Sequence, residues 1–165
     1  MVKYRKYLYF FLSLLVVVFV VWYLTRPIIS ATNEGSMTFK IYFNNNKYDP
    51  TSADCRTVFA VKRISSNQSF GPEREALTSL LDGPTTSESK SGYISSINLG
   101  VKIQKFEISG GIASVDFDET LERAVGGSCR VANIVAQINS TLEQFGTIKK
   151  IIISIDGRTE GIFQL

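Results

Sequence analysis

A long apolar run near the start of the chain is followed by short segments in which apolar and polar residues alternate. Residues 7–24 read YLYFFLSLLVVVFVVWYL and contain no charged side chain. At 1.5 Å per residue, a helix of this length is about 27 Å long, close to the thickness of the hydrocarbon layer of a bilayer. The run therefore predicts one transmembrane helix, a signal anchor over residues 7–25.

The charges beside this run predict its orientation. Residues 1–6 contain three cations, whereas Arg26 is the first charged residue after the run. Lysine and arginine favour the cytoplasmic side of a membrane, so residues 1–6 are expected to be a cytoplasmic tail and the C-terminal part to be extracytoplasmic. A cleaved signal peptide is the alternative. Its apolar part is usually shorter and ends at a small-x-small site, which residues 29–31, Ile-Ser-Ala, do not match.

Residues 26–36 and 37–165 differ in their pattern. The first segment, RPIISATNEGS, contains turn-forming residues without periodicity, which predicts a linker. The second segment has the length of one domain. It begins with MTFKIYF at residues 37–43, where apolar side chains at alternate positions predict a half-buried strand. A weaker strand pattern follows at residues 57–64.

Two helices are predicted from apolar residues at three- and four-residue spacing. The first covers residues 72–81, with Pro72 in its first turn and Gly83 just beyond its end. The second begins at Ser128, a residue type that caps helix N-termini, and is stopped by Gly146.

Three more strands are predicted in the same domain. Residues 101–108 and 112–117 form a hairpin, with a bulge near Gln104 or Lys105 because the apolar positions change parity there. Residues 149–155, KKIIISI, are apolar on both faces and predict a central strand. The order β-β-α-β-β-α-β predicts an α/β (α+β) fold, in which one mixed sheet carries two helices and one transmembrane helix precedes the domain.

Composition removes several classes of function. The chain has 18 Lys plus Arg, 15 Asp plus Glu and no histidine, which excludes Ser/His and Cys/His nucleophile pairs and the commonest zinc ligand. Four of the bases lie at or before Arg26, so residues 27–165 have 14 bases against 15 acids and a net charge of −1. Without a basic surface, binding to nucleic acid is not expected.

Five segments occur in an order that resembles a known family. They are MTFKIYF, a helix ending in LLDGP, a hairpin ending in ASVDF, a helix containing VANIVAQINSTLEQF, and the closing IIISIDG. Residues 37–157 are in this respect similar to the sporulation and spore germination (GerMN) domain family. The resemblance implies a non-catalytic extracytoplasmic domain of a membrane-anchored or lipid-anchored bacterial protein, related in fold to ring-building modules. The chain departs from some members in having one such domain and from others in having a transmembrane anchor.

Cys55 and Cys129 are the two cysteines of the chain. Both lie in the part expected outside the cytoplasm, where disulfides persist, and they are predicted to pair. The closed loop of about 75 residues would stabilise the fold by about 4 to 5 kcal/mol in the chain-entropy model. The alternative is a Cys129 thiolate, next to Arg130 at a helix start, that acts as a nucleophile. Neither a histidine nor a CxxC motif supports it.

The densest acidic cluster consists of Asp116, Asp118, Glu119 and Glu122. Its D-x-D start suggests a calcium loop, but the glycine and the final acid of such a loop are missing. Asp116 and Asp118 alternate along a strand and face the same way, yet no sugar-stacking platform accompanies them. The pattern favours a solvated strand end and helix start. No metal or cofactor site is predicted.

These observations predict a non-catalytic binding or assembly module of the bacterial cell envelope, linked by the family resemblance to sporulation or germination-type processes. The expected partners are the membrane, which the chain crosses once, and another envelope protein. A peptidoglycan-binding module is the alternative, with Tyr48 and Tyr93, both in polar loops, as candidate carbohydrate contacts. A Cys129-dependent enzyme is a third hypothesis.

The helix that starts at Ser128 also predicts an assembly state. If its apolar stripe faces its own sheet, a polar face without an aromatic or leucine anchor remains for solvent, and such a face does not form stable interfaces. Residues 36–165 are therefore expected to be monomeric at micromolar concentration. The residues assigned to this solvent face are Arg130, Asn133, Gln137, Asn139 and Ser140.

Overall fold

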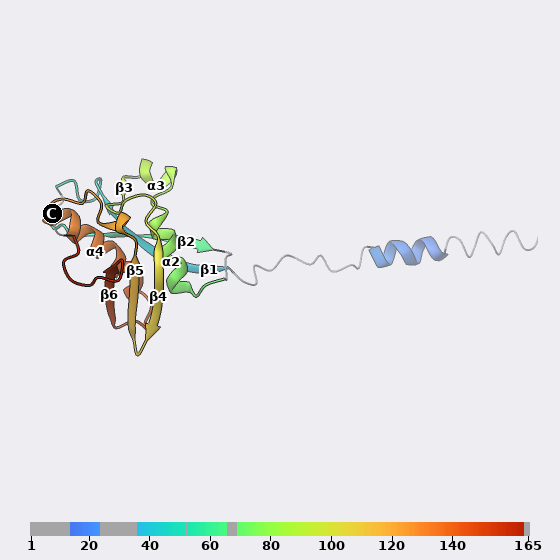
Figure 1. Cartoon of the computed structure of the whole chain (residues 1–165). Coiled ribbons are helices and arrows are strands. Elements are labelled where there is room, and N and C mark those ends of the chain that lie inside the picture. Colours follow the sequence, from blue (N-terminus) through green and yellow to red (C-terminus); the bar gives the residue numbers. More distant parts are fainter. Residues whose placement is uncertain (1–13, 24–35, 52, 66–68, 164–165) are drawn as a thin grey trace, which may run out of the picture. The chain divides into compact units, whose positions relative to one another are not determined.

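The computed structural model of the chain (Figure 1) describes residues 14–23, 36–51, 53–65 and 69–163. These residues belong to two compact units, Met1–Glu34 and Gly35–Leu165. In the first unit, residues 14–23 are helical and exposed. Within the described part of the chain, no helix combines the length and the apolarity needed to cross a bilayer. The other parts of the expected tail, anchor and linker lie outside the described residues: 1–6, 7–13, 24–25 and 26–35.

The second unit begins with an antiparallel sheet. Strand β1 (Met37–Asn45) pairs with β2 (Phe59–Ser65) along one edge and, at its last two residues, with the short β3 (Tyr93–Ile94) along the other. The strand order is β2-β1-β3. The predicted apolar face of β1 is buried, which confirms the alternation: Phe39, Ile41 and Phe43.

A second sheet is mixed and has the order β4-β5-β6. The hairpin of β4 (Ile103–Ser109) and β5 (Ile112–Phe117) turns through two glycines with positive φ, and β6 (Lys150–Ile155) runs parallel to β5. The register shifts between Ile103 and Lys105, which confirms the predicted bulge.

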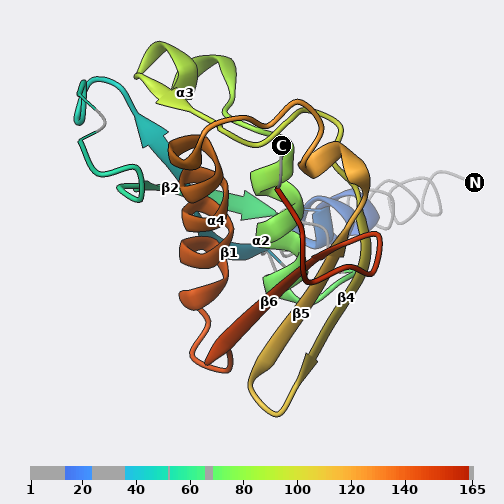
Figure 2. The ribbon, with the colours of Figure 1, turned by 60° about the vertical axis from the view of Figure 1, so that its left-hand side comes forward.

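The helices pack around the core (Figure 2). Helix α2 (Pro72–Leu81) and helix α4 (Ser128–Glu143) contact each other and β1. In Figure 2 they lie side by side, β1 and β2 run behind them, and the sheet of β4, β5 and β6 lies on the right. The buried side chains of both helices, of β1 and of β5 form one apolar core. Three short elements were not predicted, namely α3 (Thr86–Lys90), β3 and the 3-10 helix η1 (Glu119–Leu121).

The structure corrects three predictions. The domain has two three-stranded sheets instead of one mixed sheet, because Thr141 of α4 and Gln144, just beyond the helix end, occupy the edge of β1 where a further strand would have paired. Strand β6 is an edge strand of its sheet and not a central one. It reads as apolar on both faces because residues on both of its sides are half-buried. The N-cap of α4 is Gly127, with φ of 85°, and Ser128 is the first helical residue.

Candidate functional site

Helix α4 has an inner and an outer face. Ile134, Ile138 and Leu142 are fully buried, as their spacing predicts. With 3.6 residues per turn, Ala136 and Glu143 lie within about 20° of each other on the opposite side of the helix. Glu143 is exposed, whereas Ala136 is half-buried. The outer face therefore combines short apolar side chains with a charged residue at the C-terminal end.

The outer face of α4 is hollowed into an open groove of about 750 Å³. The hollow exists because two of its positions are alanines, whose side chains are short. Residues from two distant segments border it, one in the loop between β1 and β2 and one near the end of the chain. The lining of the groove includes Val131, Ala132, Val135, Ala136, Arg56 and Phe163.

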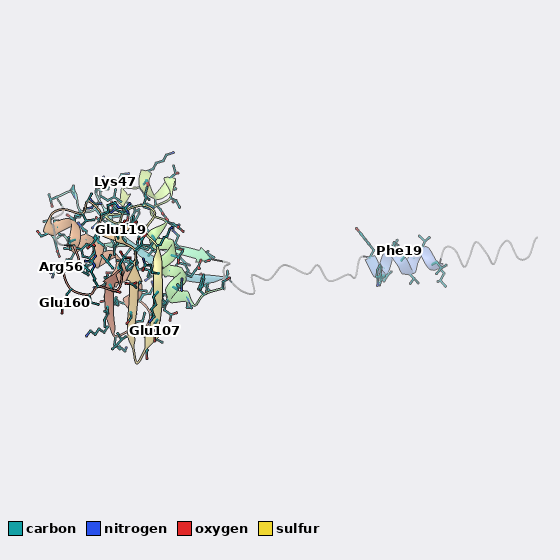
Figure 3. The ribbon with its side chains drawn as sticks, viewed as in Figure 1. Phe19, Lys47, Arg56, Glu107, Glu119 and Glu160 are labelled. Carbon is teal, nitrogen blue, oxygen red and sulfur yellow. A yellow bond between two sulfur atoms is a disulfide. The ribbon has the colours of Figure 1, made fainter. Side chains whose placement is uncertain are left out.

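A disulfide places Arg56 beside α4 (Figure 3). The neighbouring Cys55 is bonded to Cys129, in the first turn of α4, with Cα atoms 5.1 Å apart and a sequence separation of 74. The predicted pairing is therefore present. Both cysteines of the chain are used in it, so a Cys129 thiolate is not available in this state. The covalent link holds the loop between β1 and β2 against the N-terminal end of the groove.

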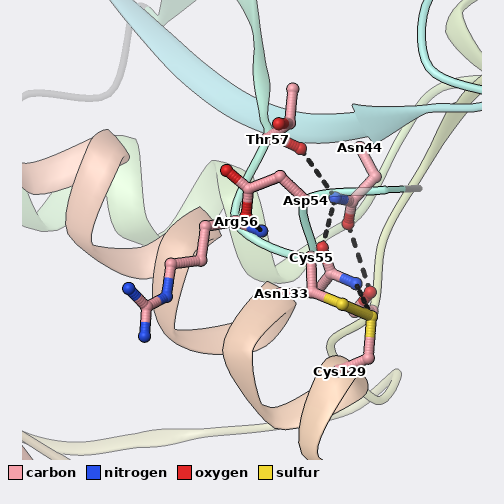
Figure 4. The surroundings of a disulfide bond; sticks show 8 residues. Asn44, Asp54, Cys55, Arg56, Thr57, Cys129 and Asn133 are labelled. Carbon is pink, nitrogen blue, oxygen red and sulfur yellow. Dashed lines mark hydrogen bonds between the residues drawn. A yellow bond between two sulfur atoms is a disulfide. The ribbon is translucent and has the colours of Figure 1, made fainter.

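The Arg56 side chain is exposed at this end of the groove. Its backbone N–H donates to the Asp54 carboxylate at 2.9 Å, but its guanidinium takes part in none of the ion pairs found among the described residues. Figure 4 shows the guanidinium directed away from Asp54 and from the disulfide. An exposed cation therefore borders an apolar groove.

The inner face of α4 contains a buried amide network. Gln137 is fully buried. Its Nε2 donates to Asn44 Oδ1 at 2.6 Å, and its Oε1 accepts the Ser95 hydroxyl at 3.2 Å. Asn44 Nδ2 donates to Asn133 Oδ1 at 2.5 Å and to the Thr57 carbonyl at 2.9 Å. The prediction that Gln137 faces solvent is wrong, because these partners satisfy its amide inside the domain.

Arg130 and Asn133, also assigned to solvent, are half-buried and hydrogen-bonded. Arg130 donates to Asn98 Oδ1 at 2.7 Å and to the Ala124 carbonyl at 3.2 Å. Asn139 and Ser140 are half-buried on the outer side. The monomer prediction has thus lost its premise, since the outer face of α4 is apolar in its middle.

The two tyrosines proposed as carbohydrate contacts lie together. The rings of Tyr48 and Tyr93 are 6.5 Å apart and edge-on, and the Tyr48 ring is 5.4 Å from that of Phe59. Tyr48 is 66% exposed, whereas the other two rings are half-buried. Strand pairing explains the arrangement, because β1 lies between the start of β2 and the short β3. The cluster is a small aromatic surface separate from the α4 groove.

The acidic cluster does not converge on one point. Asp116 accepts hydrogen bonds from Ser154 Oγ at 2.6 Å and from the Gly157 N–H at 2.9 Å, and Asp118 accepts from the Lys102 N–H at 3.0 Å. Glu119 pairs with Arg123 one turn later at 2.5 Å. Among the described residues, no group of three or more acids and cysteines is placed to hold a metal ion.

Glu122 fastens the C-terminal segment. It pairs with the Arg158 guanidinium, and its Oε2 accepts the Phe163 N–H at 3.0 Å. The hydrogen bond from the Phe163 backbone, followed by that from Arg158, lowers the pKa of the Glu122 carboxyl below its usual value. Phe163 borders the α4 groove, so this carboxylate determines part of the groove wall.

Comparison with known proteins identifies the family. The family model described as Germane, sporulation and spore germination, matches residues 40–161. This match covers most of the chain, and the chain belongs to that family. No curated protein matches the chain.

Two solved structures share the fold. The tandem GerMN domains of the sporulation protein GerM from Bacillus subtilis align with 76% of this chain, at 18% identity and a TM-score of 0.58. The first GerMN domain of the same protein aligns with 74% of this chain and 85% of its own length, at 18% identity and a TM-score of 0.52. This chain covers 40% of the tandem structure. At these identities the likeness concerns the fold alone.

The groove residues were not predicted from the sequence. Arg56 and Phe163 reach α4 only through the disulfide and through Glu122, which are long-range contacts. A local signal was present at the helix itself, where small residues recur every fourth position. These residues are Ser128, Ala132, Ala136 and Ser140.

Proposed function

We propose that the chain is a non-catalytic binding and assembly module of the bacterial cell envelope, which contacts another protein through the outer face of α4. The observation that carries this proposal is the groove of about 750 Å³ with the exposed Arg56 at its border. Apolar surface depressions with a few polar groups at the border are typical of interaction sites. The family description supports a role in an envelope process of sporulation or germination.

A non-catalytic role is supported by the chemistry of the side chains. The chain has no histidine, and its two cysteines form the disulfide. The acids of the cluster at 116–122 each accept a hydrogen bond or form an ion pair within the domain. Nucleophilic and general base catalysis require a group poised to react, and the residues that line the groove include two alanines and two valines but no acid and no cysteine.

The module is held at the cell membrane by residues 7–25, with the N-terminus in the cytoplasm and the domain outside. The three cations of residues 1–6 support this orientation, and so does the disulfide, because such bonds persist in oxidising compartments. A reporter enzyme that is active only outside the cytoplasm should work when fused after Leu165. Activity of a cytoplasm-only reporter at that position would contradict the orientation.

The partner proposal is tested by mild crosslinking of the tagged, full-length chain in membranes, followed by solubilisation and capture. Ala136→Glu places a charge in the middle of the groove and should abolish capture of the partner. Thr78→Glu places the same charge on the exposed side of α2 and should leave capture unchanged. Equal capture by the Ala136→Glu chain, or recovery of cell-wall polymer without a protein, would contradict the proposal.

A peptidoglycan contact is the second candidate function, and the clustering of Tyr48, Tyr93 and Phe59 favours it. Sedimentation of the chain with purified peptidoglycan measures this binding directly. Tyr48→Ala should reduce the bound fraction, because it removes the most exposed ring of the three. Phe70→Ala removes an exposed ring outside this cluster and serves as the control. Equal binding by both variants would exclude the aromatic cluster as the site.

A further inference from the structure

The outer face of α4 has opposite charges at its two ends. Arg56 lines the groove at its N-terminal end, whereas Asp54 lines only the adjoining hollow beside Ser128 and Ala132, and Glu143 is exposed at the C-terminal end. The first turn of α4 has neither an acid nor a side-chain cap, and the last turn has no base. The partial charges of the helix dipole, positive at the N-terminal end and negative at the C-terminal end, therefore have the same signs as Arg56 and Glu143 at those ends.

The outer face of α4 is complementary in charge to the same face of a second copy when the two helices are antiparallel. Ala136 lies seven residues after Cys129 and seven before Glu143. A two-fold rotation about an axis near Ala136 therefore brings the C-terminal end of one helix to the N-terminal end of the other. Helices approach within about 8 Å where their facing side chains are small. The small residues spaced by four along α4 permit this approach, and Val131 and Val135 add apolar area beside them.

We infer that the groove on α4 receives the α4 of a second copy of this chain, antiparallel to it, with Arg56 of each copy paired with Glu143 of the other. The inference rests on the proposed function in one respect, since both place a protein contact on the outer face of α4. An interface of this kind uses the same patch on both copies and closes as a dimer. Charge complementarity selects the antiparallel direction, because parallel helices would bring like charges together.

One helix face is smaller than the about 800 Å² per partner of a standard interface, so the pairing is weak in dilute solution. Attachment to a common membrane raises the effective concentration of the two copies. Monomeric behaviour of residues 36–165 at micromolar concentration is therefore compatible with pairing of the full-length chain in membranes.

Charge reversal tests the pairing in membranes that contain the full-length chain. Ala136→Cys lies near the two-fold axis and should form a disulfide between two copies under mild oxidation. In that background, Arg56→Glu and Glu143→Arg should each lower the yield of crosslinked dimer about five- to tenfold, because each creates like-charge contacts at both ends of the interface. The double variant should restore the yield. Within one copy these residues lie at opposite ends of the helix, so such a rescue reports a contact between copies.

A cysteine on a different helix is the control for random collision of copies in the membrane. Thr78→Cys, on the exposed side of α2, should give little crosslinked dimer. Single reversals that leave the yield unchanged, or a double variant that stays as low as the single ones, would overturn the antiparallel pairing. If the charge-reversal test fails but Ala136→Glu still abolishes capture of a different protein, the antiparallel pairing is wrong and the proposed function stands. If the Ala136→Glu chain captures its protein partner as well as the wild-type chain does, the proposed function is refuted.

Discussion

The apolar stripe of α4 is buried as helix amphipathicity predicts, but the amide and alanine side chains of the two faces are not distributed in that way. The inner face contains the buried Gln137 and, just beyond the helix end, Gln144, while the outer face has Ala132 and Ala136 in its middle. In most surface helices the polar residues face the solvent. Three polar side chains, Gln137, Thr141 and Gln144, hydrogen-bond to β1, and the middle of the outer face is left with short apolar side chains.

The strand edge explains why amides lie inside. The Lys40 backbone N–H donates to Gln144 Oε1 at 2.8 Å, and Gln144 Nε2 donates to the Lys40 carbonyl at 2.6 Å. Thr141 Oγ1 accepts the Tyr42 N–H at 3.2 Å. A primary amide offers a donor and an acceptor, as a peptide group of a further strand would. Helix α4 therefore closes an edge of β1 that would otherwise carry unsatisfied backbone groups or pair with other chains.

The largest loss of stability is expected from removal of the disulfide, which fixes the N-terminal end of α4. Cys55→Ser and Cys129→Ser should each lower the free energy of unfolding by about 4 kcal/mol, because the loop-closing constraint on the unfolded chain is lost. The double variant should lose no more than a single one. Denaturant unfolding under oxidising conditions measures these values. Additive losses, or a thiol that can be labelled in the untreated protein, would contradict the pairing.

The next effect tests the inner face. Gln137→Ala should lower the free energy of unfolding by about 2 to 3 kcal/mol, because it removes the hydrogen bonds that the buried amide makes with Asn44 Oδ1 and with the Ser95 hydroxyl and creates a cavity. Asn139→Ala, on the outer face of the same helix, should change it by less than about 0.5 kcal/mol. Equal effects of the two variants would show that the contrast between the faces has no energetic basis.

A smaller loss of stability is expected when the Gln144 amide, which bonds the free edge of β1 as a further strand would, is removed. Gln144→Ala should lower the free energy of unfolding by about 1 to 2 kcal/mol, since two backbone groups of Lys40 lose their partner. Hydrogen exchange at the Lys40 amide should become faster, while the Ile41 amide, on the side of β1 paired with β2, should keep its rate. Glu143→Ala is the matched control, and acceleration of Lys40 exchange in that variant would contradict the role of Gln144.

The predictability of the fold differs between local and long-range features. The face of β1, the limits of α2 and the bulge in β4 follow from periods of two and 3.6 residues, and the sequence predicted all three. The division into two sheets was not predicted, because it depends on Gln144 meeting Lys40, 104 residues apart. The burial of Gln137 was not predicted for the same reason, since it depends on hydrogen bonds to Asn44 and Ser95, which are distant in the sequence. Likewise, the groove depends on Arg56 and Phe163, which reach α4 from outside the helix.

The smallest expected effect is a pH dependence that should be confined to the outer side. The pKa of the Glu122 carboxyl is lowered by the Phe163 N–H and by Arg158. A carboxyl whose pKa is lower in the folded state stabilises the fold above its unfolded value of about 4.3, and this contribution is lost as the pH falls through the folded value. Glu122→Gln should therefore lower Tm by about 2 °C at pH 7.

The difference in Tm between the wild-type chain and the Glu122→Gln chain should shrink as the pH is lowered below 4, because the wild-type carboxyl then becomes neutral as well. Hydrogen exchange locates the effect. In the variant at pH 7, the Phe163 amide should exchange faster, since its acceptor has lost its charge, whereas the Lys40 amide on the inner side should keep its rate. A constant difference in Tm across this pH range, or faster exchange at Lys40, would show that Glu122 acts on the whole domain and not on the segment that borders the groove.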